Sequence, residues 1–420
     1  MKRKNHFRTL LTIVSFTIFC FVQISAQESD LFTIYKAMVV DKQTGKPLAF
    51  AGVTIEGTNY TTVTNTEGEF AIKIPSETKE ANISIQFIGF KSRSISIREF
   101  KNDKIKIELE PSAVELPEIS VISKDAETLV LSMFEKKGEN YSTQEEQLTA
   151  FYRETIRKNK TYASLSEAVV DVYKQSYNSY RSDVVKIFKA RKKTDYSKVD
   201  TLVFKLMGGP FNSLYLDLLK HPEMIFTDKM VENYDFTFDR STRIGKRLIY
   251  VVDFKQKNHI EDPLYYGKLY IDAKNLALKS AVFKLNLRDK EAAARMFIVK
   301  KPFNADAIPL ETNYRIDFIE KNNKWYYGYS RIEMALRVKW KKKLFNSTFY
   351  STIEMAVTDR NKADYDKQAV NKEKIRSNVV IADEVSGFAD PDFWGEFNVI
   401  EPEKPIEAAI RKIQKQLEKK

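Results

Sequence analysis

A two-residue alternation of apolar and charged side chains constrains the fold of this chain more than any other feature of its 420 residues. Within Arg331–Trp340, charged residues fill most positions between the apolar residues Ile332, Met334, Leu336, Val338 and Trp340. Tyr314–Phe318 follows the same pattern. Because successive side chains of a strand point to opposite faces of a sheet, the pattern predicts long antiparallel strands with one apolar and one solvated face.

Residues 122–365 are predicted to form one antiparallel β-rich domain with few helices. Two hairpin turns support it: Ala273–Asn275 between two alternating runs, and Lys321–Lys324. Helices are expected at Asp125–Lys137, where Leu129, Met133 and Phe134 share a face, and at Phe211–Lys220. The fold class is therefore mainly β, with this larger antiparallel (α+β) domain following a smaller one.

Residues 32–110 are predicted to form the smaller domain, a β-sandwich. Seven short runs alternate there: Tyr35–Val40, Ala51–Ile55, Thr61–Thr64, Phe70–Ile74, Ile83–Phe87, Ser94–Ile97 and Ile105–Leu109. Turn-forming residues separate them, and seven strands at this spacing are typical of a sandwich. Gly68 is expected at a turn with positive φ, which glycine adopts without strain.

Two segments of this region carry a family resemblance. GKPLAFAGVTIEGTNYTTVTNTEGEFAIKIP and ISIQFIGFKSRSISI resemble the carboxypeptidase-regulatory-like domain, a transthyretin-like β-sandwich common in exported Bacteroidetes proteins. The resemblance implies a spacer or interaction module rather than a catalyst. Asn65 stands where that family usually has Asp, which leaves the turn intact and weakens any cation-binding role.

Three further segments, ENYSTQEEQLTAFYRE, YYGKLYIDAKNLALKSAVF and DPDFWGEFNVIEP, resemble the body of exported Bacteroidetes proteins that carry the same N-terminal domain. This likeness implies a family and an envelope location, and no activity follows from it. A long curved antiparallel sheet with a helix against it also resembles the architecture of periplasmic lipoprotein carriers, by analogy of fold alone.

The first 26 residues have the pattern of a secretory signal peptide. Lys2, Arg3, Lys4 and Arg8 precede the apolar run Leu10–Val22, and Ile24–Ala26 offers a small residue for cleavage. The apolar run is too short for a typical membrane span, so we expect cleavage after Ala26, with a retained N-terminal anchor as the alternative. Cys20 lies inside this segment behind the large Phe19, which does not fit a lipoprotein signal.

A mature chain without the signal has no cysteine, and therefore no disulfide and no thiolate nucleophile. Export without disulfides suits a bacterial envelope, in the periplasm or at the outer membrane, and no transmembrane span is expected in the mature chain. The formal net charge of +12 becomes +8 once the four basic residues of the signal are removed. That excess favours an anionic neighbour such as a lipid headgroup or a sugar phosphate. No nucleic-acid motif is present.

The remaining segments are a linker and a tail. Residues 111–121 contain two prolines and are predicted to be extended. Residues 366–420 form the tail, whose last part, Pro405–Lys420, has an amphipathic helical pattern. Docking of this helix on the sheet is favoured over a membrane-surface role, and Asp392–Gly395 is expected to fasten the tail to the body.

The sequence gives no support for a metal or cofactor site. A catalytic zinc needs about three His or carboxylate ligands, and the mature chain has only His221 and His259, both in contexts typical of loop ends. No Gly-x-Ser-x-Gly or phosphate-binding glycine loop occurs. A Ser-His-Asp arrangement stays open. Glu261-Asp262 is the densest acidic pair near a hairpin and is interpreted as a solvated turn.

Two features are candidate ligand-binding surfaces. Arg337, Lys339 and Lys341 would share a strand face beside Trp340, which suits phosphate or anionic lipid. Trp325, Tyr327 and Tyr329 would share another face, which suits sugar rings or acyl chains. The competing interpretations are a solvated basic face for the first set and core packing for the second.

These patterns predict a non-enzymatic exported envelope protein with a binding or assembly role. The expected partner is carbohydrate, lipid, or an outer-membrane or periplasmic protein. The alternative is a periplasmic hydrolase that cleaves glycan or peptide with carboxylates of the β-rich domain; it requires carboxylates roughly 5–10 Å apart in a cleft.

Overall fold

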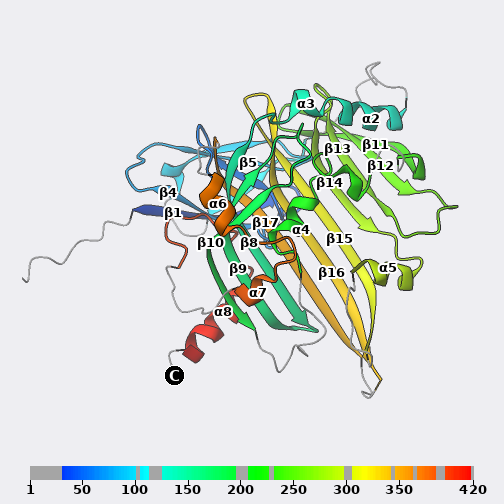
Figure 1. Cartoon of the computed structure of the whole chain (residues 1–420). Helices are drawn as coiled ribbons and strands as arrows, with labels where there is room; N and C mark the ends of the chain where they lie inside the picture. The colour runs from blue at the N-terminus through cyan, green and yellow to red at the C-terminus, as the bar shows by residue number, and fades with distance from the viewer. Residues whose placement is uncertain are drawn as a thin grey trace, which may run out of the picture.

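The computed structural model describes residues 31–100, 105–112, 125–194, 207–226, 231–297, 305–341, 346–362, 367–384 and 393–417. The predicted signal peptide and nearly all of the predicted linker lie outside these residues. Figure 1 shows a small N-terminal β domain beside a large sheet that extends along the whole molecule. The mainly β fold class is therefore confirmed.

The N-terminal domain is a sandwich of two sheets, as predicted. One sheet has the order β4-β1-β7 and the other β3-β2-β5-β6. The strands are β1 (Phe32–Asp41), β2 (Gly52–Ile55), β3 (Thr61–Val63), β4 (Glu69–Pro75), β5 (Asn82–Gln86), β6 (Arg93–Ser96) and β7 (Ile105–Leu109), with η1 (Ile97–Glu99) after β6. Alternate residues of β2, β4 and β5 fill its apolar core, among them Val53, Phe70 and Ile83.

Gly68 sits in the turn before β4 with a φ of 76°. A Cβ at that position would lie 2.6 Å from the carbonyl oxygen of Val39, so both conformation and space require glycine. The side-chain oxygen of Asn65 accepts hydrogen bonds from the amides of Glu67 and Glu69, each at 2.9 Å. The turn keeps its geometry with Asn in place of Asp.

The second domain is built on one ten-stranded antiparallel sheet with the order β10-β9-β8-β17-β16-β15-β14-β13-β12-β11. The strands are β8 (Glu146–Lys158), β9 (Thr161–Lys174), β10 (Val184–Thr194), β11 (Tyr234–Ile244), β12 (Arg247–Gln256), β13 (Tyr265–Asp272), β14 (Leu278–Leu285), β15 (Ala305–Lys321), β16 (Lys324–Trp340) and β17 (Ser347–Lys362). Both predicted hairpins occur. At the β15–β16 turn, Asn322 and Asn323 have φ values of 52° and 61°, which two-residue hairpins require.

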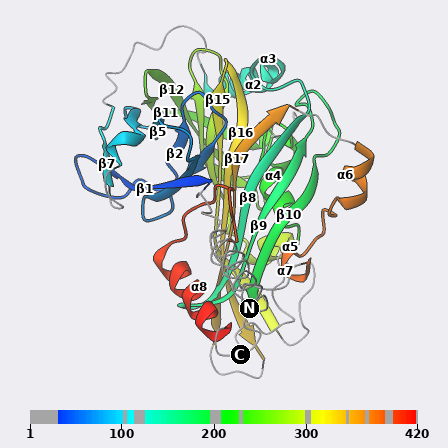
Figure 2. The same cartoon turned by 90° about the vertical axis from the view of Figure 1, so that its left-hand side faces the viewer.

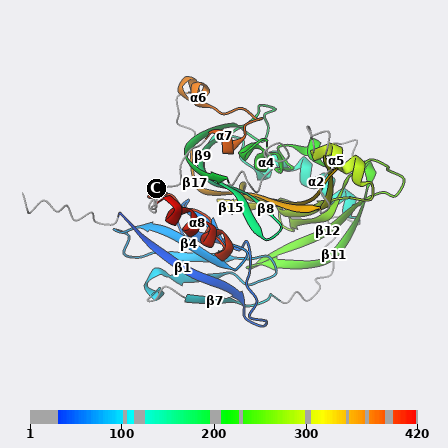
Figure 3. The same cartoon turned by 90° about the horizontal axis from the view of Figure 1, so that it is seen from below.

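The two faces of this sheet are covered differently (Figure 3). One side, called here the helix face, is accompanied by α2 (Ala126–Glu135), α4 (Pro210–Tyr215), α5 (Lys290–Phe297) and α7 (Ile381–Glu384). The short α3 (Lys137–Asn140) follows α2. The N-terminal sandwich covers the other, called here the sandwich face. The sequence predicted a solvated face; part of it is instead buried under the sandwich, because alternation marks a polar face without showing what covers it.

The helix face carries the main apolar core, to which β8, β14 and β16 contribute Tyr152, Phe283 and Ile332. A smaller apolar cluster joins the sandwich face to the N-terminal domain, and includes Val63, Phe151 and Trp394. The two domains therefore share a packed interface.

The helices agree with the sequence in part. Asp125 caps α2, its side chain accepting from the amide of Thr128 at 2.7 Å. The helix expected at Phe211–Lys220 is the shorter α4. α6 (Lys367–Glu373) and α8 (Lys404–Leu417) belong to the tail. Figure 2 shows α8 beside the sandwich. Ile406 of α8 is buried against Leu165 of β9, as the predicted docking requires.

No helix in the described part of the chain is long and apolar enough to cross a membrane.

Candidate functional site

A cavity of about 460 Å³ lies between the sandwich and the large sheet. β2, β3 and β5 of the sandwich line one side. β14, β15 and β16 and the β11–β12 turn line the other. Its volume is within the range of small-molecule sites, which are frequent at domain interfaces.

The sandwich contributes a neutral polar wall. Thr54 of β2 is paired with Ser84 of β5, and both line the cavity. Gly52 and Gln86 form the next lining pair. Alternation places these residues opposite Val53 and Ile85, which are buried in the sandwich core. The apolar half of each strand therefore holds the sandwich together, and the polar half faces the cavity.

Two β-bulges shape the opposite wall. Tyr270 and Ile271 of β13 pair with Ser280 and Leu278, which leaves Lys279 as an extra residue of β14. Bulges re-aim side chains and are frequent beside binding and active sites. Lys279 lines the cavity.

The second bulge is at Gly328 of β16, because Asp317 and Phe318 of β15 pair with Tyr329 and Tyr327. A Cβ on Gly328 would lie 2.6 Å from the Cγ1 of Ile319, so glycine is required there. The two bulges flank β15 on opposite sides.

Most charges of the sheet wall are paired with each other. The guanidinium of Arg315 donates to both oxygens of Asp317, at 2.5 and 3.1 Å. The guanidinium of Arg247 lies 3.1 Å from Asp272 and 3.2 Å from Glu320. Arg–carboxylate pairs of this kind are rigid and oriented.

Lys279 differs from these arginines. Its ammonium donates to the backbone carbonyl of Phe318. The side chain is partly buried, and burial lowers the pKa of Lys279, an effect that nearby Arg315 adds to and Asp317 opposes. Because a carbonyl carries no net charge, it does not neutralise the ammonium, and the protonated lysine can still pair with an anion.

Phe50 fixes the sandwich over the sheet. Its ring stacks on that of Tyr329 with centroids 5.7 Å apart. The guanidinium carbons of Arg315 and Arg331 lie 5.4 and 5.0 Å from the same ring. Such contacts add to the burial energy of an aromatic side chain. Phe50 has a φ of 65°, an uncommon conformation for a bulky residue that these contacts hold in place.

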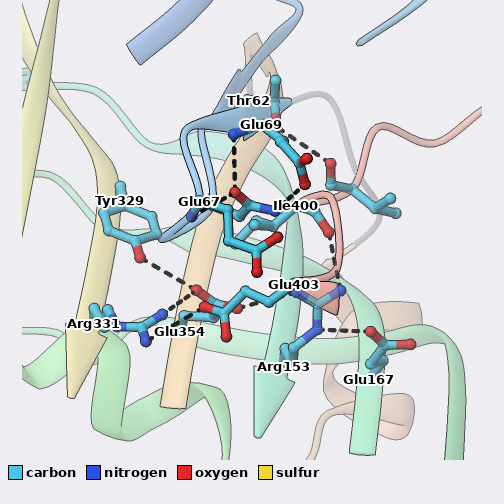
Figure 4. Close-up of polar contacts among 12 residues, drawn as sticks. Thr62, Glu67, Glu69, Arg153, Glu167, Tyr329, Arg331, Glu354, Ile400 and Glu403 are labelled. Atoms are coloured by element: carbon cyan, nitrogen blue, oxygen red, sulfur yellow. Dashed lines mark hydrogen bonds and ion pairs between the residues drawn. The ribbon is translucent and has the colours of Figure 1, made fainter. Parts of the chain in front are cut away.

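A buried ion-pair network lies beside the cavity (Figure 4). Arg153 binds Glu167 at 2.7 Å and Glu354 at 3.2 Å. Arg331 binds the other oxygen of Glu354 at 2.8 Å, and the hydroxyl of Tyr329 donates to that oxygen at 3.3 Å. Burial would raise the pKa of Glu167, but Arg153 and Arg191 outweigh it and lower that pKa.

The network also fastens the tail. Arg153 donates to the carbonyl oxygen of Ile400 at 2.9 Å. From the sandwich, the hydroxyl of Thr62 donates to the carbonyl of Val399 at 3.2 Å, and the amide of Lys73 donates to the side chain of Asn398 at 2.7 Å. Residues 398–400 therefore bond to both domains and link the sandwich to the large sheet beside the cavity.

The aromatic residues singled out in the sequence do not form an open surface. Trp325, Tyr327 and Tyr329 are each 1% exposed. The expectation that they share one face is wrong for Tyr329, because the bulge at Gly328 turns Tyr329 toward the sandwich while Tyr327 packs in the helix-face core. Trp325 and Tyr329 nevertheless border the cavity.

The basic residues singled out in the sequence lie elsewhere. Arg337, Lys339 and Lys341 are exposed near the end of β16, and Trp340 is half-buried. None of the four lines the cavity. The structure therefore separates the basic set from the aromatic set.

The histidines and the acidic pair also lie outside the cavity. His221 contacts Glu223 at 3.1 Å, and His259, Glu261 and Asp262 are exposed in the β12–β13 loop. Within the described ranges, no group of three or more His, Cys, Asp or Glu side chains is placed to hold a metal ion.

Sequence reasoning missed Lys279, Arg315 and Phe50. Arg315 and Lys279 were visible as charged positions within apolar strands. Their placement depends on bulges and on the domain contact, neither of which leaves a local signal.

Comparison with known proteins supports the N-terminal assignment. Residues 36–121 match the family model described as CarboxypepD_reg-like domain. The sandwich is a regulatory-like domain of that kind. No curated protein matches the chain.

Among solved structures, the chain is similar to a LolA superfamily protein from Nitrosomonas europaea. The likeness covers 59% of this chain and 98% of the other, with 9% sequence identity and a TM-score of 0.23. A TM-score this low does not establish a shared fold.

Proposed function

We propose that this chain is a non-enzymatic binding protein of the bacterial cell envelope, and that the cavity between its two domains holds a small carbohydrate. The observation that carries the proposal is the cavity itself: about 460 Å³, lined by both domains. Most of its lining residues belong to paired strands, and a site built on regular strands needs little ordering when a ligand enters.

The lining chemistry favours a sugar over an acyl chain. Thr54, Thr61, Ser84, Gln86 and Ser92 offer hydroxyl and amide groups along the sandwich wall. The half-buried rings of Phe50 and Phe87 add aromatic surface. A sugar presents both hydroxyl groups and apolar C–H faces, and so complements such a wall. Burial of an acyl chain would leave the polar groups without partners.

The charge pairing favours binding over hydrolysis. Three carboxylates line the cavity, those of Glu56, Asp317 and Glu320. Asp317 and Glu320 are bound to arginines, and a carboxylate in such a pair accepts hydrogen bonds and has no proton to give a leaving group. The sandwich then acts as one wall of the site rather than as a remote spacer.

The proposal is tested by applying purified protein to an array of neutral and acidic oligosaccharides, followed by calorimetry on the sugars retained. We expect binding with a stoichiometry of one and no cleavage in overnight incubations followed by mass spectrometry. Cleaved products would support the hydrolase alternative. Retention of no sugar would overturn the proposal.

A further inference from the structure

We infer that the carbohydrate carries an anionic group, a carboxylate or a phosphate, and that Lys279 binds that group. The inference rests on the proposed function, because it names the chemistry of a ligand in the same cavity. It stands on the bulge that aims Lys279 at the cavity and on the charge pairing around it.

Among the described residues that line the cavity, Lys279 is the inner cation that forms no ion pair with a carboxylate. Asp317 of β15 pairs with Ser280, the residue after Lys279, and is held by Arg315 through two hydrogen bonds. Glu320 is held by Arg247. The remaining charged lining residues, Lys246 and Glu56, lie on exposed turns at the edge of the cavity. An anion that enters the cavity would therefore bind to Lys279, and the positive charge of Arg315 nearby would add to the attraction.

The bulge explains why the lysine is placed there. In a regular ladder, residue 279 of β14 would face a partner on β13 and follow the alternation of its neighbours. As the extra residue it is released from that pairing, and its ammonium reaches the carbonyl of Phe318 on the next strand. A carbonyl leaves an ammonium two further donors for an anion.

The size of the cavity limits the ligand. A volume of about 460 Å³ suits one or two sugar rings rather than a polymer or a whole lipid. Glucuronate, galacturonate and glucose 6-phosphate match this description, and glucose and galactose are their neutral counterparts.

Protonation of Lys279 links this binding to pH. Burial lowers the pKa of the lysine in the free protein, and a bound anion favours the charged form. While the sugar stays ionised, its affinity therefore falls as pH rises through the lowered pKa of Lys279. The charged groups that line the cavity together with Lys279 are Arg315, Asp317, Glu320, Arg247, Lys246 and Glu56, and of these Arg315 and Asp317 act directly on its pKa.

The experiment is calorimetric titration of the full mature chain and three variants with the five sugars, from pH 6 to pH 10. Lys279→Met keeps the length of the side chain and removes the charge. Lys279→Arg keeps the charge at every pH tested. Lys246→Met removes an exposed cation from the edge of the same cavity, and is the matched control. Circular dichroism verifies that each variant is folded.

We expect acidic sugars to bind the native chain about tenfold or more tightly than their neutral counterparts. Lys279→Met should abolish that preference, Lys246→Met should change it less than threefold, and Lys279→Arg should retain it without the loss at high pH. Equal affinity for neutral and acidic sugars would overturn the inference and leave the proposed function standing. Binding of none of the five sugars would overturn the inference, and the oligosaccharide array decides the proposed function separately. Binding of vesicles containing phosphatidylglycerol without binding of free acidic sugars would assign the anion to a lipid and also overturn the inference.

Discussion

The two faces of the ten-stranded sheet are both covered, but by different chemistry. The helix face is a continuous apolar core from β8 to β14. The sandwich face has a small apolar cluster, a buried Arg–Glu network and a cavity. An apolar interface binds by shape and area, whereas a charged one depends on exact pairing. The helix face therefore supplies most of the stability, and the sandwich face holds the proposed site.

Among the substitutions on the sandwich face, Arg153→Leu is expected to lower the stability most. The substitution leaves Glu167 and Glu354 buried with one arginine fewer each, and we expect it to lower the free energy of unfolding by about 3–5 kcal/mol. Arg98→Leu is the control, because Arg98 and Glu80 form an exposed pair whose loss should cost less than 1 kcal/mol. Urea titration followed by circular dichroism measures both. Equal losses would show that the buried network contributes no more to stability than an exposed ion pair.

Glu154 is a buried acid on the helix face, and its ionisation should make the stability of the chain depend on pH. Burial raises its pKa to about 7, although the hydroxyl of Tyr152 donates to it at 2.8 Å and opposes that rise. Because the folded-state pKa is raised, its ionisation reduces stability as pH rises from about 4.5 to 7, by about 3 kcal/mol in total.

The measurement is the free energy of unfolding of the native chain and of Glu154→Gln at intervals from pH 4 to pH 8. The difference between them should grow in favour of the variant up to pH 7 and then stay constant. The exposed Glu77→Gln is the control and should show no such trend. A difference independent of pH would contradict the assignment of the proton to Glu154.

Phe50→Ala tests the contact between the sandwich and the sheet. Loss of the stack on Tyr329 and of two cation–π contacts should lower the free energy of unfolding by about 2 kcal/mol. Hydrogen exchange should accelerate in β2, β3 and β16 and stay slow in the sandwich core around Ile72. Phe50→Leu retains part of the burial and should have a smaller effect. Unchanged exchange in all three strands would mean that other contacts set the domain position.

The smallest effect is expected from Arg337→Ser combined with Lys339→Ser. Both side chains are exposed and outside the cavity, so stability should change by less than about 0.5 kcal/mol. Sugar affinity, measured by calorimetry, should be unchanged. A large loss of affinity would move the site to the basic face of β16 that the sequence singled out.

Much of the architecture could be predicted from local patterns. Ile332 to Trp340 alternate because one side of β16 is buried, and Asn322-Asn323 accept the positive φ of a tight turn, so strands and hairpins follow from short stretches. The sandwich was predicted for the same reason, with Gly68 as its clearest single residue.

The site could not be predicted in the same way. Tyr329 leaves the face predicted for it because one extra residue, Gly328, shifts the register. Lys279 becomes a cavity residue through another bulge. Phe50 meets Arg315 only because domains far apart in sequence pack together. Bulges and domain contacts depend on tertiary packing, which periodicity does not record.

One substitution tests most directly whether the cavity between the domains binds the ligand. Thr54, Ser84 and Ser94 lie in one row across β2, β5 and β6, but only the first two of these three line the cavity. Thr54→Trp should fill the cavity, and Ser94→Trp adds the same ring to the exposed neighbouring strand. Calorimetry with a sugar bound by the native chain should show at least a tenfold loss of affinity for Thr54→Trp and native affinity for Ser94→Trp. Native affinity in a folded Thr54→Trp variant would contradict the account.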